Sequence, residues 1–241
     1  MTGASSEALE AISFFKRLVR CACLLHDSGH SSFSHQFSRT PTIKKALAKP
    51  GRFTALWQGI PFDTIYPNQP SELEHEHFSV RAAWQILSDI PEEDLNLSIN
   101  DILSLMETTD VQPSDSFIEH AKALWQLMQP KTHKPSNGLD DDVPSQPPAL
   151  FAKKLQNVLS RIVSGELDAD RADYMLRDGF HSSVTIGGFN LDHLLSNLHF
   201  GWCPQTNWFG LAISEKGLSS LEDFVYSRHQ MYRQVYAHKT A

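Results

Sequence analysis

The sequence predicts an all-α protein, mainly a helical bundle with one small β-hairpin, and three observations support this fold class. Apolar residues recur at three- and four-residue steps through most of the chain, as one buried face of a helix requires. Alternation typical of a strand is confined to a short stretch, residues 200–213. A chain of 241 residues, 41% hydrophobic, is long enough to bury a core, and we expect a single domain over residues 1–241.

The helices can be placed in order along the chain. The first is expected over residues 6–25, where Leu9, Ile12, Phe15 and Val19 keep a helical period. The same patterning predicts the later helices. They are expected over residues 43–48, 72–87, 99–107, 117–128, 150–164, 166–177, 191–198 and 217–238.

Two segments do not fit regular helices. Residues 39–71 contain five prolines and little sustained period, which predicts an irregular insertion around a short helix. Residues 129–149 combine prolines, serines and an acidic run, which is typical of a flexible linker. Neither segment is expected to disrupt the single domain.

The composition narrows the class of function. A formal net charge of -7 argues against nucleic acid as the main ligand, since broad binding to phosphates needs a basic face. Local cations could still hold a small anionic ligand. No membrane span or targeting segment is visible, so we expect a cytoplasmic protein. Cys21, Cys23 and Cys203 are accordingly expected to be reduced thiols in the core.

A cluster of polar residues follows the first helix. His26 and Asp27 place an imidazole nitrogen and a carboxylate side by side, a ligand mixture suited to divalent metals. For the pair alone, an ordinary core histidine beside a helix-terminal aspartate is the favoured interpretation. His30 and His35 follow within nine residues, among small residues that include Gly29. This concentration favours a functional site.

Two later helices each carry a polar stripe. Asp170, Tyr174 and Asp178 stand four residues apart and share one face, beside a salt bridge expected between Asp173 and Arg177. This face suits a wet cleft that holds a metal and a sugar, although a solvated acidic surface is the plain alternative.

The stripe on the last helix is cationic and phenolic. Arg228, Tyr232 and Tyr236 are also four residues apart, with Lys239 close to the same face. Such a face can bind phosphate oxygens, although basic residues also favour any helix C-terminus.

The run HDSGHSSFSH, residues 26–35, resembles the HD-x-GH-xx-FSH signature of the deoxynucleoside triphosphate triphosphohydrolases within the HD superfamily of metal-dependent phosphohydrolases. Three further blocks resemble that family in the same order. They are HEHFSV at His75, LDADRADYMLRD over residues 167–178 and RHQMYRQVYAHKT over residues 228–240. The resemblance therefore covers residues 24–240 and implies a helical hydrolase of nucleotides.

The resemblance implies a divalent metal cofactor, one of Mn, Mg, Fe, Co, Ni or Zn, with His26, Asp27 and Asp170 as ligands. The family uses a further histidine upstream, and this sequence has none before His26. We therefore expect either that the chain is an amino-terminally shortened form of a longer protein or that three ligands hold the metal. Three protein ligands with water can still form a metal site.

The resemblance also implies residues that handle the phosphates. His30, His35 and His75 would line the phosphate path, with His75 as general acid for the leaving oxygen. Ser38 stands where relatives have an acidic partner of the catalytic histidine. The remaining implied contacts are to phosphate and sugar. They involve Arg171, Tyr174, Asp178, Arg228, Tyr232, Tyr236 and Lys239.

Three functions remain open from the sequence. The first is hydrolysis of a deoxynucleoside triphosphate to the deoxynucleoside and tripolyphosphate, which the resemblance favours. The second is phosphatase or phosphodiesterase chemistry of the same class on another nucleotide, because surrounding loops set the substrate. The third is a catalytically silent nucleotide-binding regulator. The resemblance also leads us to expect a homo-oligomer.

Overall fold

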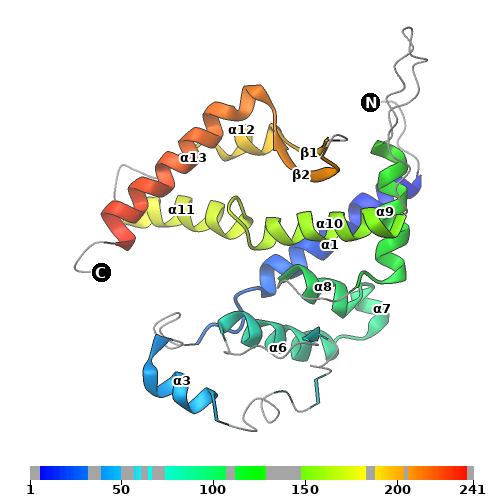
Figure 1. The fold of residues 1–241 in the computed structure, drawn as a ribbon, viewed down its shortest axis with the longest axis horizontal. Helices are drawn as coiled ribbons and strands as arrows, with labels where there is room; N and C mark the ends of the chain where they lie inside the picture. Colours follow the sequence, from blue (N-terminus) through cyan, green and yellow to red (C-terminus); the bar gives the residue numbers. More distant parts are fainter. Residues whose placement is uncertain are drawn as a thin grey trace. The chain divides into compact units, whose positions relative to one another are not determined.

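The computed structural model describes residues 6–31, 39–49, 57, 59–60, 65–66, 74–106, 112–128, 148–182, 188–203 and 206–237. Across these residues the fold is mainly helical with one two-stranded sheet, which confirms the predicted fold class (Figure 1). The chain divides into two compact units, Met1–Val163 and Ser164–Ala241. The single domain over residues 1–241 stays a prediction. No helix in the described residues is long and apolar enough to cross a membrane.

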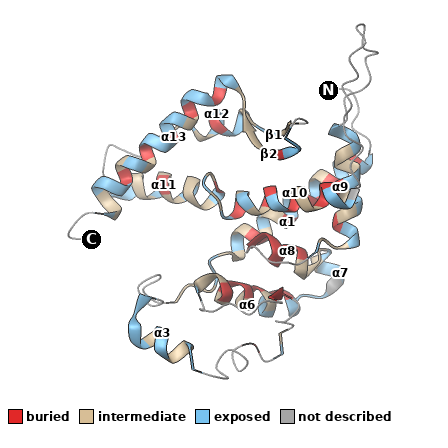
Figure 2. Ribbon diagram, in the orientation of Figure 1, coloured by how far each residue is buried: buried red, intermediate tan, exposed pale blue. Residues whose placement is uncertain are grey.

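The first unit is built from packed helices. They are α1 (Ser6–Leu25), α3 (Pro41–Leu47), α6 (His75–Ser88), α7 (Glu92–Leu95), α8 (Ile99–Met106), α9 (Asp115–Met128) and α10 (Pro148–Val163). Helices α1, α9 and α10 pack against one another, while α8 contacts α1, α6 and α10. Figure 2 shows the result, with buried residues running along almost the whole of α8. This short helix is therefore the centre of the unit.

The predicted helix boundaries in this unit lie close to the observed ones. The predicted buried face of α1 is wrong in part. Leu9 is 59% exposed, and the buried stripe instead includes Ala8, Ala11 and Leu18. Alanines allow neighbouring helices to approach closely, so the contact face follows the small residues as well as the large ones. Of the expected stripe, which also included Ala22, both Phe15 and Ala22 are buried as predicted.

The cysteines and the two irregular segments have mixed outcomes. Cys21, Cys23 and Cys203 form no disulfide in the described residues, and they are half-buried, so the prediction that they lie in the core is wrong. Within the predicted insertion the described residues include the short helix α3. The predicted linker lies outside the described residues except for its last two positions, which begin α10.

A buried carboxylate joins α8 to α9. Asp101 is fully buried, and its Oδ1 accepts a hydrogen bond from the backbone N–H of Ser114 at 3.0 Å. Its Oδ2 accepts a second from the Ser114 hydroxyl at 2.6 Å. The Ser114 oxygen in turn accepts the N–H of Phe117 at 3.1 Å and caps α9. Burial raises the pKa of Asp101, and the hydrogen bonds from Ser114 oppose that rise.

We expect Asp101→Ala to lower the free energy of unfolding by about 2–3 kcal/mol, because both Ser114 donors lose their acceptor. Asp101→Asn should cost less. The raised pKa means that the folded state keeps a proton which the unfolded state releases, so wild-type stability falls as pH rises above the ordinary aspartate pKa. The deficit of Asp101→Asn should therefore shrink over that window. Denaturant unfolding of both proteins at several pH values measures this deficit. A deficit that grows with pH would contradict a raised pKa of Asp101 in the folded state.

The second unit combines helices with the hairpin. Its elements are α11 (Ala169–His181), α12 (Leu191–Ser196), β1 (Leu198–Cys203), β2 (Trp208–Ile213), η1 (Glu215–Gly217), α13 (Leu218–Met231) and η2 (Tyr232–Tyr236). The strands pair antiparallel from Leu198 with Ile213 to Cys203 with Trp208, which confirms the predicted hairpin. Met175, Leu194 and Phe224 form a buried cluster that joins α11, α12 and α13.

Three predicted helices of this unit differ from the structure. The helix expected over residues 191–198 ends at Ser196, and Leu198 begins β1. The helix expected from residue 166 begins only at Ala169, because Asp168 has extended backbone angles and its side chain caps the helix. The helix expected over residues 217–238 ends as α-helix at Met231 and continues as the π-helical turn η2. A π turn widens the helix locally and is frequent at functional sites.

Candidate active site

The loop after α1 is held by short turns. The His26 N–H still bonds the Ala22 carbonyl at 2.9 Å, as the last bond of the helix. The Ser28 N–H then donates a hydrogen bond to the Leu25 carbonyl, and the His30 N–H donates one to the Asp27 carbonyl, each at 3.0 Å. These turns fold the chain tightly enough that His26, Asp27 and His30 are neighbours in space.

Gly29 fixes this loop against α6. Its N–H donates to the Ser79 hydroxyl at 3.0 Å. A Cβ at Gly29 would overlap the backbone of Phe78 and Ser79. Only glycine allows this approach, and the approach brings the loop to the first turn of α6, where His75 lies. The glycine that breaks the helical pattern is therefore what assembles the site.

The hydrogen bonding of His26 leaves one ring nitrogen with a lone pair that could bind a metal. Its Nδ1 lies 2.7 Å from the Cys23 carbonyl oxygen, which can only accept, so Nδ1 carries the proton. The lone pair is then on Nε2, 3.5 Å from Asp27 Oδ1. A backbone carbonyl that fixes the tautomer of a ligating histidine is a common feature of metal sites.

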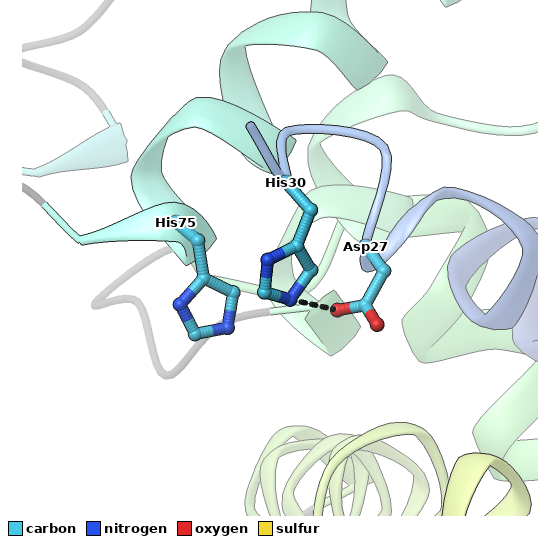
Figure 3. Close-up of side chains that lie close together, drawn as sticks. All are labelled: Asp27, His30 and His75. Carbon is cyan, nitrogen blue, oxygen red and sulfur yellow. Dashed lines mark ion pairs between the residues drawn. The ribbon is translucent and has the colours of Figure 1, made fainter. Parts of the chain in front are cut away.

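Asp27 connects His26 to two further histidines. The same Oδ1 atom lies 3.4 Å from His30 Nε2, and the Asp27 side chain is 47% exposed. The His30 ring stacks on the His75 ring, with centroids 4.1 Å apart and planes 20° apart (Figure 3). Asp27, His30 and His75 each offer a ligand atom within 4.8 Å of the others. This group can accommodate a divalent ion.

Glu76 adds a carboxylate that the sequence prediction missed. His75 Nδ1 lies 3.1 Å from Glu76 Oε2, so the acidic partner of this histidine is its own neighbour in the chain. The HEHF run contained the signal, but adjacent residues of a helix do not ordinarily face each other. Ser38, which stands where relatives have the acidic partner, lies outside the described residues.

The first turn of α6 is anchored by a third histidine. His77 is buried, and its Nδ1 accepts a hydrogen bond from the Glu74 N–H at 3.0 Å. Burial lowers the pKa of His77, which keeps the ring neutral and able to accept that bond. His77 is therefore structural and holds the turn that carries His75.

In the second unit, the acidic stripe begins just after a helix cap. Asp168 Oδ1 accepts the Arg171 N–H at 2.7 Å, and its Oδ2 accepts the Gly165 N–H at 2.8 Å. Asp170 follows in the first turn of α11. The predicted salt bridge is confirmed, with Arg177 Nη1 at 2.6 Å from Asp173 Oδ2.

The acidic and phenolic stripes meet within this unit. The Tyr236 hydroxyl donates to Asp178 Oδ2 at 2.8 Å. The Tyr174 and Tyr236 rings are in edge contact with centroids 5.8 Å apart, and Tyr232 contacts Tyr236 at 5.5 Å. Burial and the bond to Asp178 raise the pKa of Tyr236, so its phenol stays protonated. The sequence placed these residues on two faces without showing that they meet.

Two arginines converge on one carboxylate. Arg228 Nη1 donates to Glu166 Oε2 at 2.9 Å, and Arg171 Nη1 lies 3.9 Å from the same oxygen. The Arg228 guanidinium also lies 5.8 Å from the centre of the Tyr232 ring. The hydrogen bond from Arg228 lowers the pKa of Glu166, which is therefore ionised at neutral pH. Sequence reasoning gave Glu166 no role.

The predicted residues thus fall into two groups. The first unit brings together His26, Asp27, His30 and His75, and the second brings together Arg171, Tyr174, Asp178, Arg228, Tyr232 and Tyr236. His35 and Lys239 lie outside the described residues. Asp170 belongs to the second unit, and its role as a metal ligand stays a prediction.

No protein-family model matches the chain. It is 36% identical over 88 residues to an uncharacterised protein of Methanocaldococcus jannaschii, covering 35% of this chain and 18% of that protein. It is 36% identical over 107 residues to the uncharacterised protein YwfO of Bacillus subtilis, covering 44% of this chain and 22% of that protein. The matched segments therefore cover less than a quarter of the length of either relative.

A third relative has a named activity. The chain is 25% identical over 228 residues to the human deoxynucleoside triphosphate triphosphohydrolase SAMHD1, covering 92% of this chain and 29% of that protein. A hypothetical protein from Aquifex aeolicus of known crystal structure is 24% identical, with a TM-score of 0.48, covering 97% of this chain and 47% of that one. The chain thus has distant similarity to a deoxynucleotide hydrolase over nearly all its length.

Proposed function

We propose that the chain is a metal-dependent phosphohydrolase that acts on nucleotides and cleaves deoxynucleoside triphosphates to the deoxynucleoside and tripolyphosphate. The observation that carries the proposal is the group formed by His26, Asp27, His30 and His75, in which one carboxylate oxygen lies beside two imidazole nitrogens. Distant similarity to the human triphosphohydrolase supports the choice of substrate.

The donors fit a divalent metal ion. The Cys23 carbonyl fixes His26 with its Nε2 lone pair available to a cation, and Asp27 supplies an anionic oxygen nearby. The family resemblance adds Asp170 as a further ligand. An ion of this kind polarises a phosphoryl oxygen and lowers the pKa of a water molecule.

The histidines of the first unit would handle protons and phosphate charge. His75 Nδ1 lies 3.1 Å from Glu76 Oε2, and its stacking on His30 aligns the two rings. A histidine held in this way can give a proton to a leaving oxygen near neutral pH without a large shift of its pKa. We assign His75 as the general acid, with His30 and His35 along the phosphate path.

The family resemblance assigns residues of the second unit to phosphate and sugar. Arg171 and Arg228 offer planar guanidinium groups that match phosphate oxygens. The family resemblance assigns Tyr174 and Asp178 to the sugar, and both side chains contact Tyr236. Tyr232, Tyr236 and Lys239 complete the assigned contacts. The same resemblance suggests a homo-oligomer, which analytical ultracentrifugation would test.

A panel of nucleotides tests this function. The purified chain is incubated with Mn²⁺, Mg²⁺, Co²⁺ or Ni²⁺ and with deoxynucleoside triphosphates, ribonucleotides, monophosphates or cyclic nucleotides, and phosphorus NMR identifies the products. We expect tripolyphosphate from deoxynucleoside triphosphates. Orthophosphate or pyrophosphate from another nucleotide would keep the hydrolase class and change the substrate. No product from any nucleotide would contradict the proposal.

His75→Gln tests the assignment of the general acid within the same assay. Turnover should fall by about 10²- to 10⁴-fold, the usual contribution of acid–base catalysis. The affinity for the metal should stay close to that of the wild type, because His26 and Asp27 are unchanged. A parallel loss of metal affinity would show that His75 is a ligand instead.

A further inference from the structure

Glu166 stands between two arginines in a position that an anionic ligand would also take. Its Oε2 atom accepts a hydrogen bond from Arg228 Nη1 at 2.9 Å. The same oxygen is 3.9 Å from Arg171 Nη1, too far for a hydrogen bond. One carboxylate oxygen thus faces two guanidinium groups and accepts a hydrogen bond from only one of them.

The second acidic neighbour of Arg171 differs in kind. Asp168 Oδ2 lies 3.3 Å from Arg171 Nη1, but this side chain is 6% exposed and already accepts two backbone N–H groups. It is a fixed part of the helix cap. Glu166, by contrast, is 86% exposed, and the ion pairs recorded for its carboxylate in the described residues are with the two arginines. Glu166 is the partner that can leave.

Arg171 retains an unused donor at this position. Its Nη1 atom is buried and forms no hydrogen bond among the described residues. A buried donor left in this way is costly, and a ligand that satisfies it gains affinity. A phosphate group presents several oxygens and could accept from Arg171 and Arg228 together, which the Glu166 carboxylate does not do in this arrangement.

We propose that Glu166 occupies the phosphate position between Arg171 and Arg228, and that a phosphate group of the ligand must displace it. The identity of the ligand rests on the nucleotide phosphohydrolase function proposed above. Glu166 then competes with every incoming anion. A weakly charged anion exchanges poorly with the carboxylate, whereas a polyphosphate carries enough charge to replace it, so Glu166 favours polyphosphates over simple anions.

Binding of inorganic tripolyphosphate to the whole chain tests this inference without any reaction. Isothermal titration calorimetry is performed in metal-free buffer at low ionic strength, because salt screens exposed charges. We expect Glu166→Gln to bind tripolyphosphate about fivefold more tightly than the wild type, the scale of one exposed ion pair. Arg228→Gln should remove most of the binding.

Asp173→Asn is the matched control. It removes the same charge from an exposed aspartate of α11 that is likewise hydrogen-bonded to an arginine, Arg177 at 2.6 Å. It should leave the affinity close to that of the wild type. Equal tightening in both variants would reduce the effect to net charge and overturn the inference. Weaker or unchanged binding in Glu166→Gln would overturn it as well, since Glu166 would then position Arg228.

The outcome is separable from that of the proposed function. A chain that binds tripolyphosphate more tightly after Glu166→Gln but hydrolyses no nucleotide would keep this inference and lose the enzymatic proposal. If the chain hydrolyses nucleotides but Glu166→Gln does not change its affinity for tripolyphosphate, the enzymatic proposal stands and this inference is wrong. Circular dichroism of each variant checks that the helices are intact.

Discussion

Asp27→Asn is expected to lower the affinity of the chain for divalent metal by at least about 100-fold and to remove nucleotide hydrolysis. Loss of residues that merely orient metal ligands already costs about 10- to 100-fold, so loss of a ligand should cost more. Asp27 connects the other residues of the site, because its Oδ1 atom lies beside both His26 and His30. The asparagine amide keeps the shape of the Asp27 carboxylate but not its negative charge.

Metal binding and product formation of this variant are measured side by side. Asp94→Asn, an exposed aspartate of α7 in the same unit, is the control for net charge and should match the wild type in both assays. Undiminished metal binding by Asp27→Asn would remove this residue from the metal centre. Retained metal binding with lost hydrolysis would reassign it to the reaction itself.

Gly29→Ala is expected to destabilise the first unit by about 1–3 kcal/mol and to reduce hydrolysis by about 100-fold. The added methyl group would overlap the backbone of Phe78 and Ser79 at the first turns of α6. Relief requires the loop to move away from α6, and that movement separates His30 from His75. A shift of this kind damages catalysis even where every catalytic side chain is retained.

Gly188→Ala is the control for the loss of a glycine. A Cβ at Gly188 meets no atom of the described residues within 4 Å, so this change should be tolerated. Denaturant unfolding and the nucleotide assay measure both variants. Full activity and unchanged unfolding of Gly29→Ala would show that the loop does not depend on this close contact.

The sequence predicted the elements that depend on local pattern. The α1 boundaries and the cluster at its end were readable because apolar spacing and polar composition change together at His26. The salt bridge between Asp173 and Arg177 was predictable for the same reason, since a four-residue step fixes the distance on a helix.

Contacts between distant segments were not readable in this way. The stacking of His30 on His75 depends on Gly29 lying against Ser79, fifty residues away in the chain. Glu166 escaped notice because its role comes from Arg228, which is brought close only by the packing of α11 against α13. Small residues and π turns that alter a helix face, as in α1 and η2, likewise depend on tertiary packing.

Mn²⁺ is titrated into the metal-free chain, and electron paramagnetic resonance follows the unbound ion. We expect stoichiometric binding by the wild type that competes with Mg²⁺ and is lost in Asp27→Asn. Absence of specific binding to the wild-type chain, or identical binding by Asp27→Asn, would contradict the proposal that His26 and Asp27 hold a divalent metal ion.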